Sequence, residues 1–470
     1  MSKMKITRSK MLIIWLLGGG GVLGWCWAMN ALAVQNTTSS IEATSSTISL
    51  NNQTVSITKA GTYTLNWTIS NGQLIVDVWE GNEIRLKLAG ANITSKDSSA
   101  ILIKSGKVTI ELVSGTNNIL TDGTYDENAE ENATIYSEED LIIEWEGRLK
   151  INANGNDGIT SKDDLTIKSW NIEVQAADDG IRGKDSLTID GGKINVVAGG
   201  DGLKSDHETK GAIVMNDGEV SISAGSDGAE AYKTLTINGG TLNILKSYEG
   251  LESEVITIND GEISIVSSDD GINISDSSST TSEGMMHRNG TASGRILTIN
   301  GGKITIDAGT DGLDANGAIE MNGGTVLVFG PTNDGNAALD YDETFTMNGG
   351  TLLAFGSNGM AMNVSNGSQN SVLIRLSSQQ SAGAKFSLVD SNGNTILEAT
   401  STKVWSSVVV STADLKLNSE YRYLVNGVEA GSFTLTSSVM SSGTSGGMIW
   451  GGMQSGMWGP GGHRFSNQTR

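Results

Sequence analysis

The stretch that decides the fold is DGIRGKDSLTIDGGKINVVAGG, residues 179–200, which a second Asp-Gly pair follows at residues 201–202. Apolar and polar residues alternate from Leu187 to Ile189 and again from Ile194 to Ala198, which is the period of a β-strand. Gly191-Gly192 between these runs predicts a tight turn. The stretch therefore predicts one coil of a parallel β-helix, with short strands joined at glycine corners.

Acid-glycine pairs recur along the chain and define the repeat. They lie 21 to 26 residues apart, except for one interval of 41 that contains an insertion rich in Ser, Thr and Gly near Ser277 to Gly294. A helical solenoid would need apolar residues at a spacing near 3.6, which the repeat lacks. We expect an all-β fold, a right-handed parallel β-helix, because parallel crossovers are almost always right-handed. The pairs begin at Asp157, Asp179, Asp201, Asp227, Glu249, Asp270, Asp311 and Asp334.

The chain divides into four expected parts. Residues 1–33 combine a basic start, an apolar run and Ala31-Leu32-Ala33, which is typical of a cleaved signal peptide; a retained membrane anchor is the alternative. Residues 34–370 are expected to form the β-helix with its N-terminal cap coils. Residues 371–436 lose the Asp-Gly period and predict a small β module or cap. Residues 437–470 predict a disordered tail rich in Gly, Met and Trp.

Charge and cysteine content restrict the expected partners. The formal net charge is −22, which disfavours nucleic acid and anionic lipid. Cys26, the only cysteine, lies in the signal peptide, so the mature chain has no disulfide. We expect a monomer that is secreted or held at the cell surface, with membrane contact only through the signal peptide.

Stacked acids suggest a metal site. Aspartates at one position in successive coils would lie about 4.8 Å apart and repel each other. Either they face water as ordinary turn residues, or they bind a hard cation such as Ca²⁺. A second set of acids follows within a few residues, and we expect both sets at one corner, with the strongest sites at Asp157, Asp179, Asp201 and Asp227. The candidate calcium ligands are Asp157, Asp163, Asp178, Asp179, Asp185, Asp201, Asp206, Asp227, Glu230, Glu249, Glu252, Asp269, Asp270, Asp311 and Asp314.

The repeated motifs resemble those of a known family. Residues 157–163 (DGITSKD), 179–185 (DGIRGKD) and 187–194 (LTIDGGKI) resemble the secreted bacterial carbohydrate-binding β-helix proteins, whose fold is similar to that of family 9 pectate lyases. The resemblance spans roughly residues 40 to 435. It implies calcium held by the Asp-Gly acids, binding of a plant-type polysaccharide such as cellulose or pectin, and no demonstrated catalysis. Glu249 departs from the expected Asp, which implies weaker calcium binding there.

Basic residues near the acids raise the question of catalysis. In calcium-dependent pectate lyases a Lys or Arg removes a proton next to a uronate carboxylate, while the metal stabilises the developing charge. The candidates for this base are Lys162, Arg182, Lys184 and Lys204. They recur with the repeat, so we favour the interpretation that each neutralises a neighbouring carboxylate.

Exposed aromatic side chains are the usual platforms for sugar rings. The candidates are Trp67, Trp79, Trp145 and Trp170, of which Trp170 occupies the slot of Gly192 and is therefore expected to be exposed at a turn. Two alternatives stay open. In the first, the tryptophans are incidental surface residues. In the second, some of them are glycines in the native protein, because its genome reads as glycine a stop codon that the printed sequence translates as tryptophan.

Three functions remain open from the sequence. The preferred one is a non-catalytic, calcium-dependent extracellular protein that binds polysaccharide of the cellulose or pectin type. The first alternative is a calcium-dependent pectate lyase that cleaves polygalacturonate by β-elimination. The second is a cell-surface adhesin or structural protein in which calcium only stiffens the solenoid.

Overall fold

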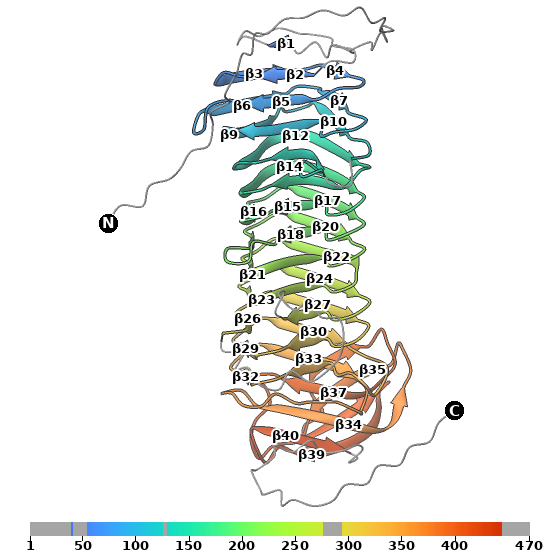
Figure 1. The fold of residues 1–470 in the computed structure, drawn as a ribbon. Coiled ribbons are helices and arrows are strands. Elements are labelled where there is room, and N and C mark those ends of the chain that lie inside the picture. The colour runs from blue at the N-terminus through green and yellow to red at the C-terminus, as the bar shows by residue number, and fades with distance from the viewer. Residues whose placement is uncertain (1–38, 41–53, 126–128, 276–293, 444–470) are drawn as a thin grey trace, which may run out of the picture. The chain divides into compact units, whose positions relative to one another are not determined.

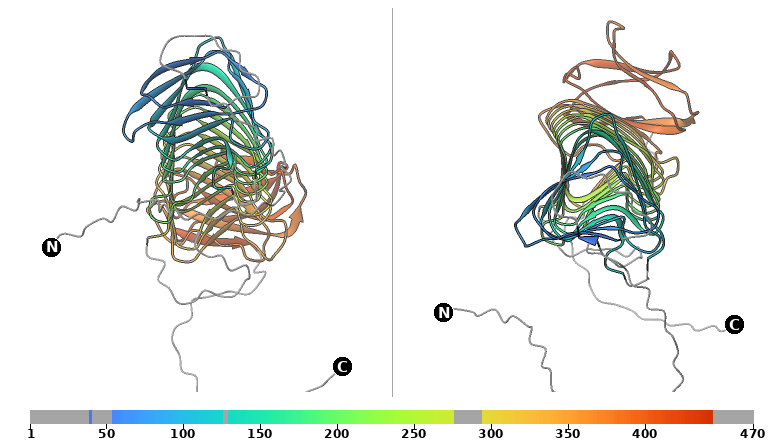
Figure 2. Two further views of the ribbon diagram at one scale, coloured as in Figure 1. Left: turned by 45° about the horizontal axis from the view of Figure 1, so that its top comes forward. Right: turned by 90° about the horizontal axis from the view of Figure 1, so that it is seen from above.

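The computed structural model describes residues 39–40, 54–125, 129–275 and 294–443, and these residues form strands without any helix (Figure 1). The strands stack in three parallel ladders, and each coil contributes one strand to each ladder. Figure 2 shows successive coils lying over one another when the stack is viewed from its end. The expected all-β parallel β-helix is confirmed. Within the described residues, no helix is long and apolar enough to cross a membrane.

The three ladders have the following members. The first contains β1 (Ser39–Ser40), β2 (Val55–Ile57), β5 (Leu74–Asp77), β8 (Ile101–Ser105), β11 (Ala133–Ser137), β13 (Asp157–Ser161), β15 (Ile181–Gly183), β18 (Leu203–Ser205), the starts of β21 (Ala229–Ile237) and β23 (Leu251–Ile258), β25 (Ile272–Ile274), β28 (Leu313–Ala315) and β31 (Leu339–Tyr341). The second contains β3 (Gly61–Leu65), β6 (Glu83–Leu88), β9 (Lys107–Leu112), the starts of β12 (Leu141–Ala153) and β14 (Asp164–Ala176), β16 (Ser186–Ile189), β19 (Ala212–Met215), the ends of β21 and β23, β26 (Ile296–Ile299), β29 (Ala318–Met321) and β32 (Phe345–Met347). The third contains β4 (Thr68–Ile69), β7 (Asn92–Thr94), β10 (Asn117–Thr121), the ends of β12 and β14, β17 (Lys193–Ala198), β20 (Glu219–Ser223), β22 (Thr241–Ser247), β24 (Glu262–Ser267), β27 (Lys303–Ala308), β30 (Thr325–Phe329) and β33 (Thr351–Gly356).

Inward-facing aliphatic side chains form the core. Leu187 pairs in register with Leu165 and Ile213, and all three are buried. Fully burying such a side chain contributes about 1.5–3 kcal/mol, and the contribution repeats in every coil. The period-2 pattern of the sequence therefore sets which side of each strand faces inward.

A ladder of asparagine amides supports the corner between the second and third ladders. The Nδ2 atoms of Asn238, Asn259 and Asn300 each donate to the Oδ1 atom of the asparagine in the preceding coil, at 2.8 Å. Two residues further along, Gly240 and Gly302 have φ values of +81°, a conformation that glycine adopts without strain. This amide ladder was not predicted from the sequence.

Two of the candidate tryptophans lie near this corner. Trp145 has φ of +82°, which is rare for a residue with a side chain. Trp170 lies inside the continuous strand β14, so the expected turn at this residue is wrong; its side chain lies outside the described residues. Strand pairing nevertheless makes Trp170 equivalent to Gly192. Asn171 pairs with Lys193, so Trp170 and Gly192, each one residue earlier, occupy the same position in successive coils, and Gly192 has φ of +97°.

Replacing Trp145 with glycine should stabilise the protein by about 1 kcal/mol, because glycine adopts a left-handed φ without the steric cost that an L side chain incurs. The midpoint of urea unfolding measures the effect. Trp79→Gly is the control, since Trp79 is also exposed but has no positive φ, and it should not stabilise. A less stable Trp145→Gly variant would show that indole contacts, such as the 3.1 Å hydrogen bond from Nε1 to Glu144 Oε1, outweigh the backbone strain.

The expected C-terminal β module is present. β37 (Trp405–Ser411) pairs antiparallel with β33 and with β34 (Ser371–Gln380), and thereby continues the last coil. A separate antiparallel sheet has the order β36 (Thr395–Thr400), β35 (Lys385–Asp390), β38 (Glu420–Val425) and β39 (Val428–Thr434). β40 (Val439–Gly443) pairs with β34, so regular structure extends past Ser437, where the disordered tail was expected to begin.

Two other expected segments fall largely outside the described residues. The signal peptide, residues 1–33, lies outside them, as does the tail after Gly443. The insertion expected near Ser277 to Gly294 falls between β25 and β26, and residues 276–293 lie outside the described residues. The register supports its placement, because Ile258 pairs directly with Ile299 in the next coil.

Candidate metal and glycan site

The acids of the Asp-Gly pairs stack at the corner between the third and first ladders. The backbone N–H of Asp179 donates to Asp157 Oδ1 at 3.2 Å, that of Asp201 to Asp179 Oδ1 at 2.9 Å, and that of Asp227 to Asp201 Oδ1 at 2.9 Å. One oxygen of each carboxylate thus binds the next coil, which is a structural role. The second oxygen of each carboxylate contacts a side chain of the protein, Thr160 for Asp157 and Lys204 for Asp179 and Asp201. We call the following residues the first row: Asp157, Asp179, Asp201, Asp227, Glu249, Asp270 and Asp311.

A second row runs beside the first, on the outward positions of the first ladder. Its members pair in register from coil to coil and lie three residues after the first-row position. In chain order they are Arg182, Lys204, Glu230, Glu252, Asn273, Asp314 and Asp340. The row therefore mixes cations, acids and an amide.

Three predicted ligands do not belong to this corner. Asp163, Asp185 and Asp206 follow strands β13, β15 and β18 and so lie at the opposite end of the first-ladder strands. The expectation that both acid sets share one corner is wrong for them, because they come six residues after Asp157 or Asp179 and five after Asp201, whereas Glu230 comes three after Asp227. Asp185 instead forms ion pairs with Lys210 and, at 3.5 Å, with His207 Nε2. Asp206 pairs with Arg182.

The doubled acids and Asp334 also differ in position. Asp178 is exposed, whereas Asp269 is half-buried and its Oδ1 accepts a hydrogen bond from Thr310 Oγ1 at 2.6 Å. Asp334 precedes the row in its coil, since the backbone N–H of Ala337 donates to Asp311 Oδ1 there. The Asp-Gly step of that coil is therefore replaced by Ala337-Ala338.

Protein cations lie beside the acids in the N-terminal part of the rows. Arg182 Nη2 lies 2.5 Å from Asp206 Oδ2, and Arg182 Nη1 lies 3.8 Å from Asp157 Oδ2. Lys204 Nζ contacts Asp201 and lies 3.5 Å from Asp179 and 3.3 Å from Glu230. The first three predicted strongest metal sites thus have a protein cation beside them.

The same contacts bear on the candidate catalytic bases. Burial alone would lower the pKa of Lys204, but the carboxylates of Asp201, Asp179 and Glu230 outweigh it and raise the pKa above its usual range. The pKa of Arg182 is raised in the same way by Asp206 and Asp157. A general base must be unprotonated, so both groups are poorly suited to this role. Lys162 and Lys184 follow β13 and β15, at the corner of Asp163 and Asp185.

The C-terminal part of the rows contains a carboxylate cluster without such a cation. Ligand oxygens of Asp270, Asp311 and Asp314 all lie within 4.8 Å of one another. None of the ion pairs between described residues involves these three. Burial, together with Asp270 and Asp340, raises the pKa of Asp311 to about 7 and that of Asp314 to about 8. These carboxylates would hold a proton or a cation more favourably than they would remain bare.

Asn273 adds a neutral oxygen at this cluster. It pairs in register with Asp314 and is 8% exposed. Its Nδ2 donates to Glu249 Oε2 at 2.8 Å, whereas its Oδ1 is buried without a hydrogen-bond partner. Such an unsatisfied acceptor costs about 1–3 kcal/mol, which a bound cation would offset. Carboxylate and amide oxygens together are the donor set that calcium prefers, so these residues fit the ion.

Raised carboxyl pKa values predict that the metal-free protein loses stability as pH rises. Burial raises the pKa of Asp227 to about 7, of Glu230 to about 8 and of Glu249 to about 9. The folded state binds these protons more tightly than the unfolded chain, so stability is greatest below the unfolded pKa values near 4 and declines up to about pH 9.

Thermal unfolding in chelator should therefore show a falling melting temperature between pH 5 and pH 8. Saturating calcium at pH 8 should restore much of the loss, because it neutralises the same groups. A melting temperature that rises over this range in chelator would contradict the expectation.

The candidate sugar platforms also differ in exposure. Trp67 is 4% exposed and packs in the core, so its predicted role as a sugar platform is wrong. Trp145 is 53% exposed and Trp79 is 85% exposed. Residues 66–67 follow β3 on the way to β4, where alternation points Trp67 inward between Leu65 and Ile69.

These features define the chain as a parallel β-helix protein with an acidic row along one edge. The model of the family described as carbohydrate-binding domain-containing protein matches residues 51–335, more than half of the sequence, and the chain belongs to this family. A curated relative of the same description from Acetivibrio thermocellus (strain ATCC 27405) is 43% identical over 135 residues, which is 27% of this chain and 47% of the relative. The chain thus spans about half the length of this relative.

A solved structure also shows similarity. It is described as a polysaccharide lyase-like protein from C. thermocellum, in a gadolinium derivative, and is 32% identical with a TM-score of 0.40. The match covers 49% of this chain and 96% of the other.

Proposed function

We propose that this protein is a non-catalytic, calcium-dependent polysaccharide-binding protein that acts outside the cell as a monomer. The observation that carries the proposal is the cluster of Asp270, Asp311 and Asp314, which lies beside the unpartnered Oδ1 of Asn273. Membership of the carbohydrate-binding domain family supports polysaccharide as the partner.

The C-terminal part of the rows would hold the metal. Asp270, Asp311 and Asp314 would supply carboxylate oxygens and Asn273 an amide oxygen, with Asp340 next in the second row. Asp270 is kept in place because its Oδ1 also accepts the backbone N–H of Asp311 at 2.9 Å. A bound calcium ion supplies positive charge that an acidic polymer of the pectin type can approach. Sequence analysis missed Asn273 and Asp340, although both stand three residues after a first-row position.

The basic residues support a non-catalytic role. Lys204 and Arg182, the bases closest to the acid rows, are held protonated by their carboxylate partners. We therefore expect that polygalacturonate incubated with the protein and calcium forms no ultraviolet-absorbing unsaturated ends. Steady formation of such ends would favour the lyase.

Retention on insoluble polysaccharide tests the binding function. The full chain is incubated with cross-linked polygalacturonate and with cellulose, in calcium or in chelator. We expect calcium-dependent retention that Asp314→Asn weakens and that Asp414→Asn, a change of an exposed acid in the C-terminal module, leaves intact. Failure of the calcium-loaded protein to bind cellulose, pectin or related polymers would favour the adhesin or structural alternative.

A further inference from the structure

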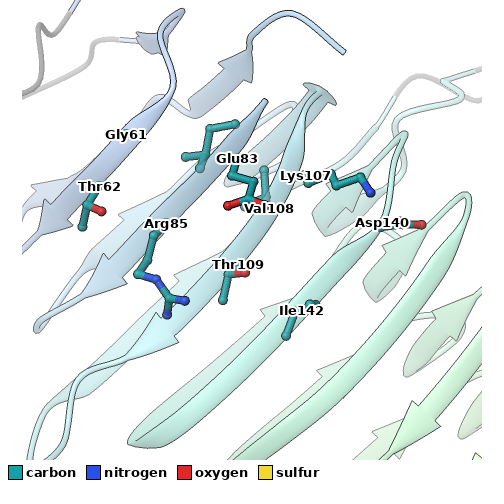
Figure 3. Close-up of a pocket in the computed structure, with 10 residues that line it drawn as sticks. Gly61, Thr62, Glu83, Arg85, Lys107, Val108, Thr109, Asp140 and Ile142 are labelled. Carbon is teal, nitrogen blue, oxygen red and sulfur yellow. The ribbon is translucent and has the colours of Figure 1, made fainter. Parts of the chain in front are cut away.

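A groove lined by polar and apolar side chains lies on the second ladder (Figure 3). It has a volume of about 450 Å³, which is in the range of small-ligand sites. Its base is formed by outward side chains that pair in register across β3, β6, β9 and β12, namely Thr62, Arg85, Thr109 and Ile142. The acid rows begin only at β13 and follow the first ladder, so the two features occupy different ladders and different coils.

The groove carries balanced charge, unlike the rest of this acidic protein. Glu83 and Asp140 line it together with Arg85 and Lys107. Arg85 is fixed, because its Nη1 donates to Glu144 Oε1 at 2.6 Å and to Glu111 Oε2 at 3.2 Å. Hydrogen-bond donors and acceptors are therefore both present among the residues that line the groove. Such a surface suits an uncharged ligand rich in hydroxyl groups.

An exposed tryptophan lies four residues before the groove residue Glu83 in the chain. Trp79 is 85% exposed and belongs to a tight turn closed by the hydrogen bond from Asn82 N to Trp79 O at 3.1 Å. Glu83, a groove residue, follows directly after this turn, and the backbone N–H of Lys107 donates to Asn82 O at 2.9 Å. An indole exposed to this degree contributes little to folding, whereas its face can pack against a sugar ring.

We propose that this groove binds an uncharged stretch of a polysaccharide chain without calcium. Trp79 stacks on one sugar ring, while Thr62, Thr109 and the fixed guanidinium of Arg85 contact hydroxyl groups of the next. The inference deepens the proposed function, and it rests on the carbohydrate partner of that function but not on its metal. The protein then has two glycan contacts: a neutral one in the first coils and a metal-dependent one further along.

Isothermal titration of the full chain with a soluble cello-oligosaccharide in chelator tests the proposal. Trp79→Ala should bind about tenfold more weakly, and Thr109→Arg, which fills the groove, should abolish binding. Val428→Ala, a change of an exposed apolar residue in the C-terminal module, should bind as wild type does. The calcium-induced rise in melting temperature, measured in parallel, should be the same in all four proteins and shows that each is folded.

The outcomes separate this groove from the acid rows. Unchanged affinity in both Trp79→Ala and Thr109→Arg would overturn the groove, and so would a wild-type protein that binds no neutral oligosaccharide in chelator. In either case a persisting calcium-dependent retention on polygalacturonate leaves the proposed function standing. Conversely, if the protein binds the oligosaccharide but calcium does not raise its melting temperature, the groove proposal stands and only the calcium-dependent function is rejected.

Discussion

Calcium at a hundredfold excess over its dissociation constant should stabilise the folded protein by about 2.7 kcal/mol for each independent site, because the proposed sites exist only in the folded rows and not in the unfolded chain. Asp314→Asn should lose most of this gain, since it removes a carboxylate whose oxygens lie within 4.8 Å of those of Asp270 and Asp311. In chelator at pH 8, the effect of Asp314→Asn on the free energy of unfolding should have the opposite sign. Burial raises the pKa of Asp314 to about 8, so the ionised group destabilises the metal-free fold and the variant should be the more stable protein.

Asp157→Asn is the matched control for this prediction. Asp157 belongs to the same first row, but Arg182 already lies 3.8 Å from its carboxylate. Its calcium response should therefore remain close to that of wild type. Chemical unfolding of the three proteins in calcium and in chelator gives the comparison. A wild-type unfolding midpoint that calcium leaves unchanged would exclude the rows as a metal site.

The coil itself was predictable because its determinants are local. Alternation in Leu187–Ile189 and Ile194–Ala198 sets the inward faces, and the glycine pair between them sets the corner. The identity of neighbouring side chains across coils was only partly predictable. Glu230 and Asp163 both follow an Asp-Gly pair closely, yet a difference of three residues puts them at opposite ends of a strand.

The second row also contains residues that are not acids, and the pattern of acids in the sequence could not identify them. A search for acids finds Glu230, Glu252 and Asp314 but passes over Arg182, Lys204 and Asn273, which stand at the same register position. Once strand pairing fixes the register, the N-terminal acids prove to have protein cations and the C-terminal acids do not. For this reason our proposal places the metal among the C-terminal acids, although Asp201, Asp227 and Glu230 also have oxygens within 4.8 Å of one another.

Lys204→Met should destabilise the metal-free protein by about 3–5 kcal/mol. The lysine is 23% exposed, and its ammonium group contacts Asp201, Asp179 and Glu230, so an apolar side chain of similar length leaves three partly buried carboxylates without a countercharge. Calcium should recover a large part of the loss, because oxygens of Asp201, Asp227 and Glu230 already lie within 4.8 Å of one another. Urea unfolding with and without calcium measures both effects.

Lys193→Met serves as the control for that variant. Lys193 pairs with Glu219 across the third ladder, but both side chains are half-exposed, so its loss should change stability little and without regard to calcium. If Lys204→Met is equally destabilised with and without calcium, a calcium ion cannot replace the ammonium group of Lys204 beside these carboxylates. Recovery by calcium would mean that one rule governs both rows: each carboxylate group is neutralised either by a side chain of the protein or by a bound ion, and the second row decides which.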